Sequence, residues 1–380
     1  MRTRTGLLTA LVVAAVAPPA SAATLVVAPG GSIQTAIDKS HAGDTVKVLA
    51  GTYVEKGRRC PTDAAKRCAV VIRKDGIRLI GQPTPGHPVV LASNGKQFQG
   101  VAVSRAAGGK ACLTDRARRI HGSRVEGVLV QGFAHDGVFL YCVDGWRITR
   151  VRATGNDEYG IFPSHSGKGR VDRSFASGAN DTGIYVGQSH DVEIDHNTAT
   201  GNVSGFEIEN SRRVRAHHNT AFGNTAGILS FALPGLDVKR NVGNRIDHNV
   251  VRANDRANTC SDPEDTVCNV PPGSGILLVA AHRNTVEYNE VRSNRTVGIA
   301  VVNYCIVTGT PSTTCTNDID PNPVDDHVLQ NVALGNAGNP AHPYETIASD
   351  LVWDTTGTGN CWALNRYATS FPGSLPQCPP

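Results

Sequence analysis

The sequence predicts an all-β fold, a parallel β-helix built from one continuous series of repeats. Three observations predict this fold. A pattern recurs every 22 or 23 residues, its strands are short and alternate apolar with polar side chains, and glycine and asparagine occur at the turns. The chain of 380 residues has 40 glycines, 5% aromatic residues and one methionine, which is unusual for a helical protein and typical of a turn-rich β architecture.

The repeat is clearest in two segments that begin at Val192 and Val214, 22 residues apart. In the strand Gly205–Glu209, Phe206 and Ile208 share one face and two glutamates share the other. One such coil cannot close a core alone, but coils stacked about 4.8 Å apart can bury one. Residues 23–380 are therefore predicted to form a single β-helix domain. The glycines that open the strands are Gly137, Gly160, Gly183, Gly205, Gly227, Gly275 and Gly298.

A pair of asparagines five residues apart marks the turns of each coil. Asparagine side chains in turns bond to backbone amides and tolerate left-handed conformations, so these pairs are predicted to be structural. The pairs are Asn197/Asn202, Asn219/Asn224, Asn249/Asn254, Asn289/Asn294 and Asn331/Asn336. His196, His218 and His248 precede this series and raise the alternative of a metal-handling β-helix. Ring stacking or solvent exposure is the preferred interpretation, and no metal site is predicted.

The amino terminus predicts export. Arg2 and Arg4 precede an apolar run, and Ala20-Ser21-Ala22 has the small-residue pattern of a cleavage site, so residues 1–22 are predicted to be a signal peptide. No later apolar stretch is long enough to span a bilayer, and the mature protein is predicted to be secreted and extracellular. The segment Ser32–Asp38 has an N-cap residue and helical spacing, and is predicted to be a short helix that caps the open end of the core.

The ten cysteines fall into near neighbours, which in an oxidising compartment predicts five local disulfides. The predicted pairs are Cys60–Cys68, Cys112–Cys142, Cys260–Cys268, Cys305–Cys315 and Cys361–Cys378. A zinc site is the alternative, but no CxxC pair favours it. Without the two signal arginines, 35 basic residues face 33 acidic ones, and this net charge of +2 predicts no nucleic-acid partner.

Three insertions interrupt the repeat, and insertions into a solenoid often border its binding face. They are residues 232–243, the Cys260–Cys268 loop, and the Cys305–Cys315 loop with the Asp-rich segment that follows it. That segment ends at Asp325-Asp326 and makes calcium a possible cofactor, although its spacing matches no EF-hand loop and a solvated loop is the alternative. No cofactor is certain.

The opening Ile33-Gln34-x-Ala36-Ile37, with Gly43-Asp44-Thr45-Val46 and Gly51-Thr52-Tyr53 after it, resembles the start of secreted pectin-lyase-like proteins. Segments Tyr159–Pro163 and Gly183–Ser189 are similar to a bacterial group of parallel β-helix repeat proteins. The resemblance implies a single-stranded, right-handed parallel β-helix (solenoid), and general chain chirality agrees. The superfamily contains polysaccharide lyases, hydrolases and epimerases as well as non-catalytic members, so fold alone does not choose a function.

Residues 159–165 are also similar to the Tyr-Gly-x-Asp-Pro-His motif of alginate epimerases, in which Asp and His perform acid/base chemistry. Here Phe162 stands at the position of the acid, and His165 is displaced by one residue. The match implies epimerase or lyase chemistry only weakly.

Alignment of the strands predicts a candidate site on one outward face. One column holds Phe139, Phe162, Tyr185, Glu207 and Leu229, the next holds Tyr141, Ser164, Gly187, Glu209 and Phe231, and His165, Gln188 and Asn210 follow at the strand ends. Aromatic faces bind sugar rings, and carboxylates and amides bind hydroxyls or move protons. Glu207, Glu209, Tyr185 and His165 are the candidate catalytic residues, and Phe139, Phe162, Gln188, Asn210 and Phe231 are the candidate substrate-binding residues.

These residues predict a secreted protein that acts on a polysaccharide as a uronan lyase, an epimerase or a glycoside hydrolase. A non-catalytic extracellular carbohydrate-binding or envelope scaffold is the alternative, and whether the chain is an enzyme stays open. For lyase chemistry, Tyr159 is a further candidate base, and Arg212 and Arg213 are candidate charge stabilisers. Two structural interpretations compete: a solvated strand face, or a face covered by the segment between Cys361 and Cys378.

A second pair of columns carries charge and is predicted to be structural, because opposite charges on neighbouring coils neutralise one another. The columns are Arg147, Arg170, Glu193, Arg215 and Arg245, and Thr149, Asp172, Asp195, His217, Asp247 and Glu287.

Overall fold

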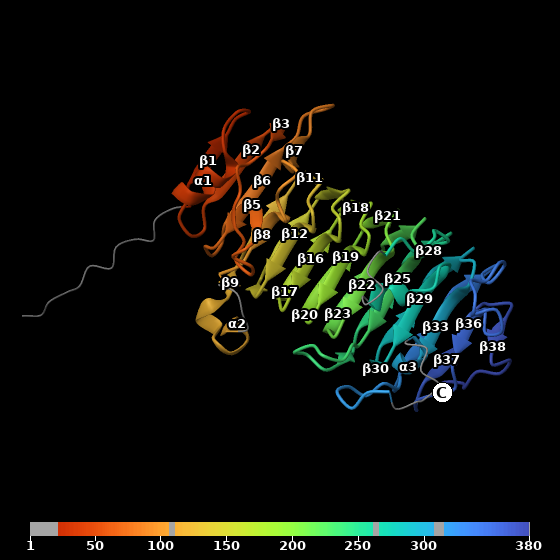
Figure 1. Ribbon diagram of the computed structural model, residues 1–380. Coiled ribbons are helices and arrows are strands. Elements are labelled where there is room, and N and C mark those ends of the chain that lie inside the picture. The colour runs from red at the N-terminus through yellow and green to blue at the C-terminus, as the bar shows by residue number, and fades with distance from the viewer. Residues whose placement is uncertain (1–21, 106–110, 261–265, 308–314, 380) are drawn as a thin grey trace, which may run out of the picture.

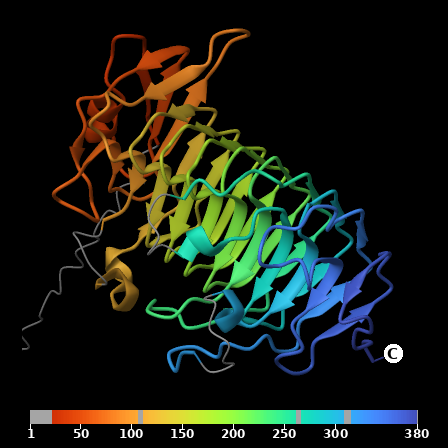
Figure 2. The same ribbon diagram turned by 45° about the vertical axis from the view of Figure 1, so that its right-hand side comes forward.

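The computed structural model describes residues 22–105, 111–260, 266–307 and 315–379. Its strands follow one another in chain order from one end of the molecule to the other and form three long sheets (Figures 1 and 2). Neighbouring strands of these sheets are parallel except β4 and β5, which pair in antiparallel fashion. The predicted parallel β-helix is therefore confirmed. The predicted signal peptide lies outside the described residues except for Ala22.

Sheet A follows the path β1 (Thr24–Val27), β2 (Thr45–Leu49), β6 (Arg78–Gln82), β10 (Arg124–Glu126), β14 (Arg147–Thr149), β17 (Gly167–Asp172), β20 (His190–Asp195), β23 (Arg212–His217), β27 (Arg245–Asp247), β31 (Thr285–Glu287), β34 (His327–Leu329) and β37 (Cys361–Ala363). Short strands beside this path are β9 (Ile120–His121), β13 (Val143–Asp144), β26 (Asn241–Val242) and β30 (Ala281–His282).

Sheet B consists of β3 (Gly51–Tyr53), β7 (Val89–Ala92), β11 (Leu129–Gln131), β15 (Arg152–Thr154), β18 (Phe175–Ser177), β21 (Thr198–Thr200), β24 (Thr220–Phe222), β28 (Val250–Arg252), β32 (Glu290–Arg292) and β35 (Val332–Leu334). Sheet C consists of β4 (Arg58–Arg59), β5 (Arg67–Ile72), β8 (Gln99–Val103), β12 (Asp136–Tyr141), β16 (Tyr159–Ser164), β19 (Thr182–Gly187), β22 (Ser204–Glu209), β25 (Ala226–Phe231), β29 (Ser274–Val279), β33 (Val297–Val302), β36 (Ser349–Trp353) and β38 (Ser370–Phe371).

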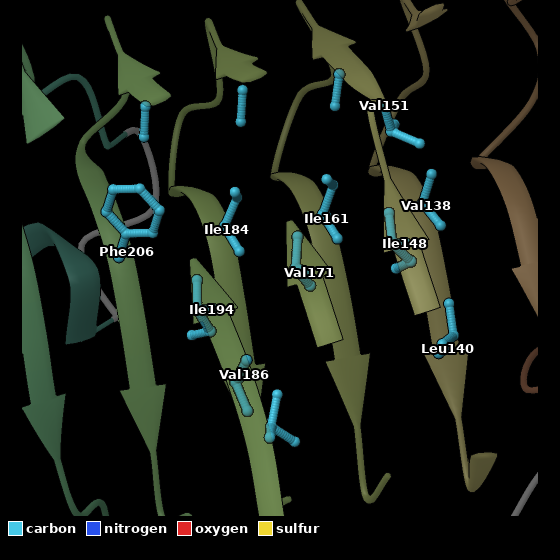
Figure 3. Close-up of a cluster of buried hydrophobic side chains, with 14 of the residues drawn as sticks. Val138, Leu140, Ile148, Val151, Ile161, Val171, Ile184, Val186, Ile194 and Phe206 are labelled. Atoms are coloured by element: carbon cyan, nitrogen blue, oxygen red, sulfur yellow. The ribbon is translucent and has the colours of Figure 1, made fainter. Parts of the chain in front are cut away.

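Inward side chains of the three sheets form one continuous core. Figure 3 shows Ile161, Ile184 and Phe206 of sheet C in a row, facing Val171 and Ile194 of sheet A. All five side chains have no exposed surface. Burying each side chain of this size stabilises the folded state by about 1.5 to 3 kcal/mol. The stacked rows together therefore stabilise coils that would not be stable singly.

The glycine that opens most sheet C strands is required by close backbone approach. A Cβ built on Gly160 would lie 2.4 Å from the carbonyl oxygen of Gly183, and one on Gly205 would lie 2.6 Å from that of Gly227. Both distances are far below van der Waals contact. The regular recurrence of glycine in the sequence thus results from the close stacking of coils at this corner.

Two asparagine ladders hold successive coils together, as predicted. Asn219 accepts hydrogen bonds from the backbone N and the side-chain Nδ2 of Asn197, both at 3.0 Å, and it donates to the carbonyl of Ile194 and to Asn249 Oδ1. The same pattern runs through Asn202, Asn224, Asn254, Asn294 and Asn336. Each ladder supplies hydrogen-bond partners to backbone N–H and C=O groups that are buried at the turns of the coil.

Short helices cap and border the coil. The predicted cap is α1 (Ile33–Lys39), whose N-cap residue Ser32 accepts from Thr35 N, and Ile33 packs into the core. The others are α2 (Ala111–Thr114), η1 (Arg116–Arg118), η2 (Thr266–Asn269) and α3 (Tyr304–Val307). At the far end, Trp362 and Leu375 join the core, so the segment between Cys361 and Cys378 closes the last coil.

All five predicted disulfides are formed, with Cα–Cα distances between 4.7 and 6.1 Å. No free cysteine remains among the described residues. No helix within these residues is both long and apolar enough to cross a membrane.

Candidate functional site

The outer face of sheet C carries the predicted columns in the predicted register. Phe139 lies beside Phe162, Tyr185 beside Glu207, and Glu207 beside Leu229. The rings of Phe162 and Tyr185 stack with centroids 4.4 Å apart at 13°. Strand alternation therefore places an aromatic platform next to two carboxylates on the same face.

Glu207 and Glu209 project from the same face of β22 because they are two residues apart. Their exposed fractions are only 4% and 6%, so the alternative interpretation of a solvated strand face with ordinary glutamates is wrong. The hydroxyl of Tyr185 donates a hydrogen bond to Glu209 Oε2. Burial raises the pKa of Tyr185 well above its usual value, and the nearby carboxylates of Glu209 and Glu207 raise this pKa further.

A cavity of about 160 Å³ opens over these glutamates. Tyr159, Asp181, Tyr185, Glu207 and Glu209 line its polar end. Burial, followed by the charge of Asp181, raises the pKa of Tyr159 well above its usual value. Both tyrosines are thus protonated at neutral pH and can donate hydrogen bonds. Of the described residues that line the cavity, none is Lys, Arg or His.

The predicted insertions form the walls of this cavity. Leu233 comes from the first insertion, and Val267 lies on η2 in the second, with Val270 just after it. Ile306 lies on α3 at the start of the third insertion, with Tyr304 just before that insertion. These segments cover an apolar part of sheet C and make a second hydrophobic cluster outside the coil. The C-terminal segment between Cys361 and Cys378 contributes no residue to the described lining.

Three predicted site residues hold the first insertion in place and do not line the cavity. Asn210 donates to the carbonyls of Leu233 and Val238 and accepts from Leu233 N. Gln188 Oε1 accepts from Asp237 N and Val238 N, and His165 Nε2 lies 3.4 Å from Asp237 Oδ2. His165, Gln188 and Asn210 all have positive φ at the end of a sheet C strand, which directs their side chains toward this loop.

The other predicted residues divide between platform and cavity. Phe231 lines the cavity, whereas Phe139 and Phe162 extend the aromatic platform away from it. Arg213 is exposed and pairs with Asp191 at 2.6 Å, and Arg212 lies on sheet A. Neither arginine is among the residues lining the cavity, so the structure does not bring a charge stabiliser to the glutamates from either position.

Sequence reasoning missed Asp181, which lies immediately before β19 and faces the same cavity. It also missed the apolar lining from later coils, such as Leu277 and Val352. Asp181 immediately precedes a sheet C strand that carries a candidate residue, a position that could have marked it. The later apolar residues gave no such signal.

The charged columns of sheet A are structural, as predicted. Both Nε and Nη2 of Arg170 bond to Asp195 at 2.7 Å, and Arg147 bonds to Asp172 in the same way at 2.8 and 2.9 Å. The predicted histidine stack is also confirmed: the rings of His196 and His218 are 5.1 Å apart at 3°, and those of His218 and His248 are 5.1 Å apart at 8°.

The fold and this site define the class of protein, a right-handed parallel β-helix of the pectin-lyase-like kind with an acidic cavity on one outer face. The family model described as periplasmic copper-binding protein (NosD) matches residues 113–365, which is 253 of the 380 residues. The chain therefore belongs to the NosD family. The family description and the disulfides agree with a location outside the cytoplasm. No curated protein sequence matches the chain.

Solved structures with the same fold include two mannuronan C-5 epimerase A-modules of Azotobacter vinelandii. The AlgE4 module has a TM-score of 0.61 at 18% identity, over 88% of this chain and 82% of that one. The AlgE6 module has a TM-score of 0.62 at 16% identity, over 90% and 86%. The periplasmic alginate epimerase AlgG has a TM-score of 0.57 at 15% identity, over 90% and 76%. At these identities the likeness shows the fold alone.

Few donor groups in the described part of this chain could hold the copper that the family description names. One group of described residues has the spacing of a metal site: Glu193, Asp195 and His217, whose donor atoms lie within 4.8 Å of one another. His217 Nε2 is buried without a hydrogen-bond partner among the described residues. However, both oxygens of Asp195 are occupied by Arg170, and Glu193 lies 3.4 Å from the same guanidinium.

Other copper donors are scarce. The cysteines are in disulfides, and the single methionine is Met1. In the stack of His196, His218 and His248 the rings are nearly parallel, at 3° and 8°, so their nitrogen lone pairs lie in parallel planes and do not converge on one ion. The described residues therefore do not fit a copper ion.

The Asp-rich segment uses its carboxylates within the protein. Asp318 accepts from Lys239 Nζ and Gly235 N, both at 2.6 Å, and Asp320 accepts from Asn322 N at 3.0 Å. These carboxylates have partners other than a metal ion.

Proposed function

We propose that this protein, after export, hydrolyses a glycosidic bond with Glu207 and Glu209 as its acid/base pair. The observation that carries the proposal is two buried glutamates on one strand face, one of them bonded by Tyr185, at the polar end of a cavity. Glycoside hydrolysis uses two carboxyl groups flanking the bond. Side chains two residues apart on a strand are about 7 Å apart, which accommodates either stereochemical course.

The hydrogen bond from Tyr185 supports a different role for each glutamate. The protonated hydroxyl donates to Glu209, which favours the carboxylate form of that group. Glu209 is then the base or nucleophile, and Glu207 is the acid that protonates the departing oxygen. Water supplies the hydroxyl that replaces it on the sugar, so one C–O bond is broken and one is formed.

Uronan lyase and epimerase reactions are less well supported by this cavity. Both reactions need a base and a positive group beside the uronate carboxylate. The described lining offers three acids and no cation, which disfavours an anionic sugar. In addition, Phe162 occupies the position of the epimerase acid and stacks on Tyr185.

The test is incubation of the purified protein with neutral glycans, amino-sugar glycans and uronans, each with and without calcium. New reducing ends without unsaturated products are expected, and Glu207→Gln or Glu209→Gln should each lower the rate at least about 100-fold while the melting temperature changes little. Glu290→Gln is the matched control, because Glu290 is exposed on sheet B, and this variant should keep full activity. Unsaturated products would refute hydrolysis, and activity retained in both glutamine variants would remove the pair from the reaction.

A second candidate function is non-catalytic binding of a glycan by the same cavity. The stacked Phe162 and Tyr185 rings favour it, because an aromatic platform offers apolar contact to a sugar ring. Retention on a polysaccharide column without any turnover would support this function over hydrolysis.

A further inference from the structure

The cavity is acidic at one end only. The column that holds Glu207 continues along sheet C through Leu229, Leu277, Ala300 and Val352, which are register partners on successive strands. These four outward side chains are at most 7% exposed. The floor of the cavity thus changes from carboxylate to hydrocarbon within one coil.

Two polar side chains beside this apolar floor use their hydroxyl protons inside the protein. Ser274 Oγ donates to the carbonyl of Pro271 at 2.8 Å, and Thr296 Oγ1 donates to that of Pro272 at 2.5 Å. Both residues line the cavity. Because these two protons are not available to a ligand, the register column from Leu229 to Val352 gives this end mainly apolar contact.

The size of the cavity limits its occupant to one small group. An apolar cavity of about 150 Å³ in another protein accommodates benzene, and this cavity measures about 160 Å³. It therefore has room for one ring or a chain of about six carbons, and not for a stretch of polysaccharide.

We propose that the cavity encloses the apolar substituent of an uncharged glycoside, such as an alkyl or aryl group joined to the sugar by the glycosidic bond. The substituent lies over Leu229, Leu277 and Ala300, and the bond that joins it to the sugar lies beside Glu207 and Glu209. This inference rests on the proposed function for the role of the glutamates. The negative charge of the carboxylates at the polar end disfavours an anionic glycoside, and the apolar floor gives the substituent its affinity.

Calorimetric titration with methyl, hexyl and octyl β-D-glucoside and with 1-hexanol tests the inference. Each buried methylene contributes about fourfold in affinity at best, so hexyl should bind at least about 30-fold tighter than methyl, and octyl no tighter than hexyl. Binding of 1-hexanol should also be measurable, because it needs no particular sugar.

Two variants locate the effect. Ala300→Leu fills the cavity and should remove the gain from methyl to hexyl, whereas Leu277→Ala enlarges it and should extend the gain to octyl. Ala363→Leu, on sheet A outside the cavity, is the matched control and should change neither. Should Ala300→Leu fail to fold, Leu277→Ala still tests the site.

The outcomes separate this inference from the proposed function. Absence of both 1-hexanol binding and any gain with alkyl length overturns the inference, whatever the hydrolysis assays show. Hydrolysis of a glycan with no preference for an apolar substituent also overturns it and leaves the function intact. Chain-length-dependent binding without turnover of any glycoside, unchanged by Glu207→Gln, supports the apolar site and overturns the function.

Discussion

Replacing Asp326 with asparagine should stabilise the protein, and increasingly so as the pH rises. Asp326 belongs to a third ladder, between Asn284 and Asn360. Asn284 N donates to Asp326 Oδ1 at 2.8 Å, and Asp326 N donates to Asn360 Oδ1 at 3.0 Å. The side chain is fully buried, and its Oδ2 atom has no hydrogen-bond partner among the described residues. Burial raises the pKa of Asp326 from 3.8 to about 8, and the charge of Asp325 adds to the shift.

The direction of the pH effect follows from which state holds the proton. Between about pH 4 and pH 8 the folded protein keeps the Asp326 proton and the unfolded chain releases it, so the free energy of unfolding falls as pH rises. About four pH units at about 1.4 kcal/mol each set an upper limit near 6 kcal/mol. Because water entry and relaxation reduce such penalties, about 2 to 4 kcal/mol is expected for Asp326→Asn at pH 8, and little at pH 4.

Guanidinium denaturation followed by circular dichroism at pH 4, 6 and 8 measures this difference. Asp255→Asn is the matched control, because that side chain is exposed and is not a cause of the pKa shift of Asp326. The control should change the free energy of unfolding by no more than about 0.5 kcal/mol. A gain for Asp326→Asn that is equal at pH 4 and pH 8, or a loss at pH 8, would refute the reasoning.

Two further predictions concern the ladders and the charged columns. Asn219→Ala should lower the free energy of unfolding by about 1 to 3 kcal/mol, because it leaves Asn197 N and the Ile194 carbonyl buried without partners; the exposed Asn317→Ala should change it little, and equal effects would mean that the ladder is not structural. Arg170→Ala should lower it by about 2 to 4 kcal/mol, because the buried Asp195 would lose its guanidinium partner and keep only the contact with His196. Adding Asp195→Asn to Arg170→Ala should recover part of that loss, and no recovery in denaturation experiments would show that the buried charge is not the cause.

The regular parts of this structure were predictable because they depend on contacts between equivalent positions of adjacent coils. One known coil length is enough to align Tyr185 with Glu207 and to stack His196 on His218, and the structure has both contacts. The disulfides were predictable for a related reason, since each closes a short loop.

The irregular parts depend on how the insertions fold back, which no repeat encodes. Leu277 resembles any outward residue of a strand until η2 is known to cover it. Gln188 and Asn210 were predicted to bind substrate because they follow the aromatic and acidic columns, but residues 233–238 fold toward them and take their hydrogen bonds. The sequence pattern puts Asp326 at a ladder position. The free-energy cost of ionising it, however, follows only from its complete burial in the structure.

The asparagine ladders bond successive coils even where the chain between them varies in length. Asn197 bonds to a partner 22 residues later, Asn219 to one 30 residues later, and Asn249 to one 40 residues later. Extra chain thus leaves the coil and returns without shifting its register. The insertions that line the cavity can therefore change in length and sequence without disturbing the asparagine ladders. Ligand preference can then change while the β-helix itself stays the same.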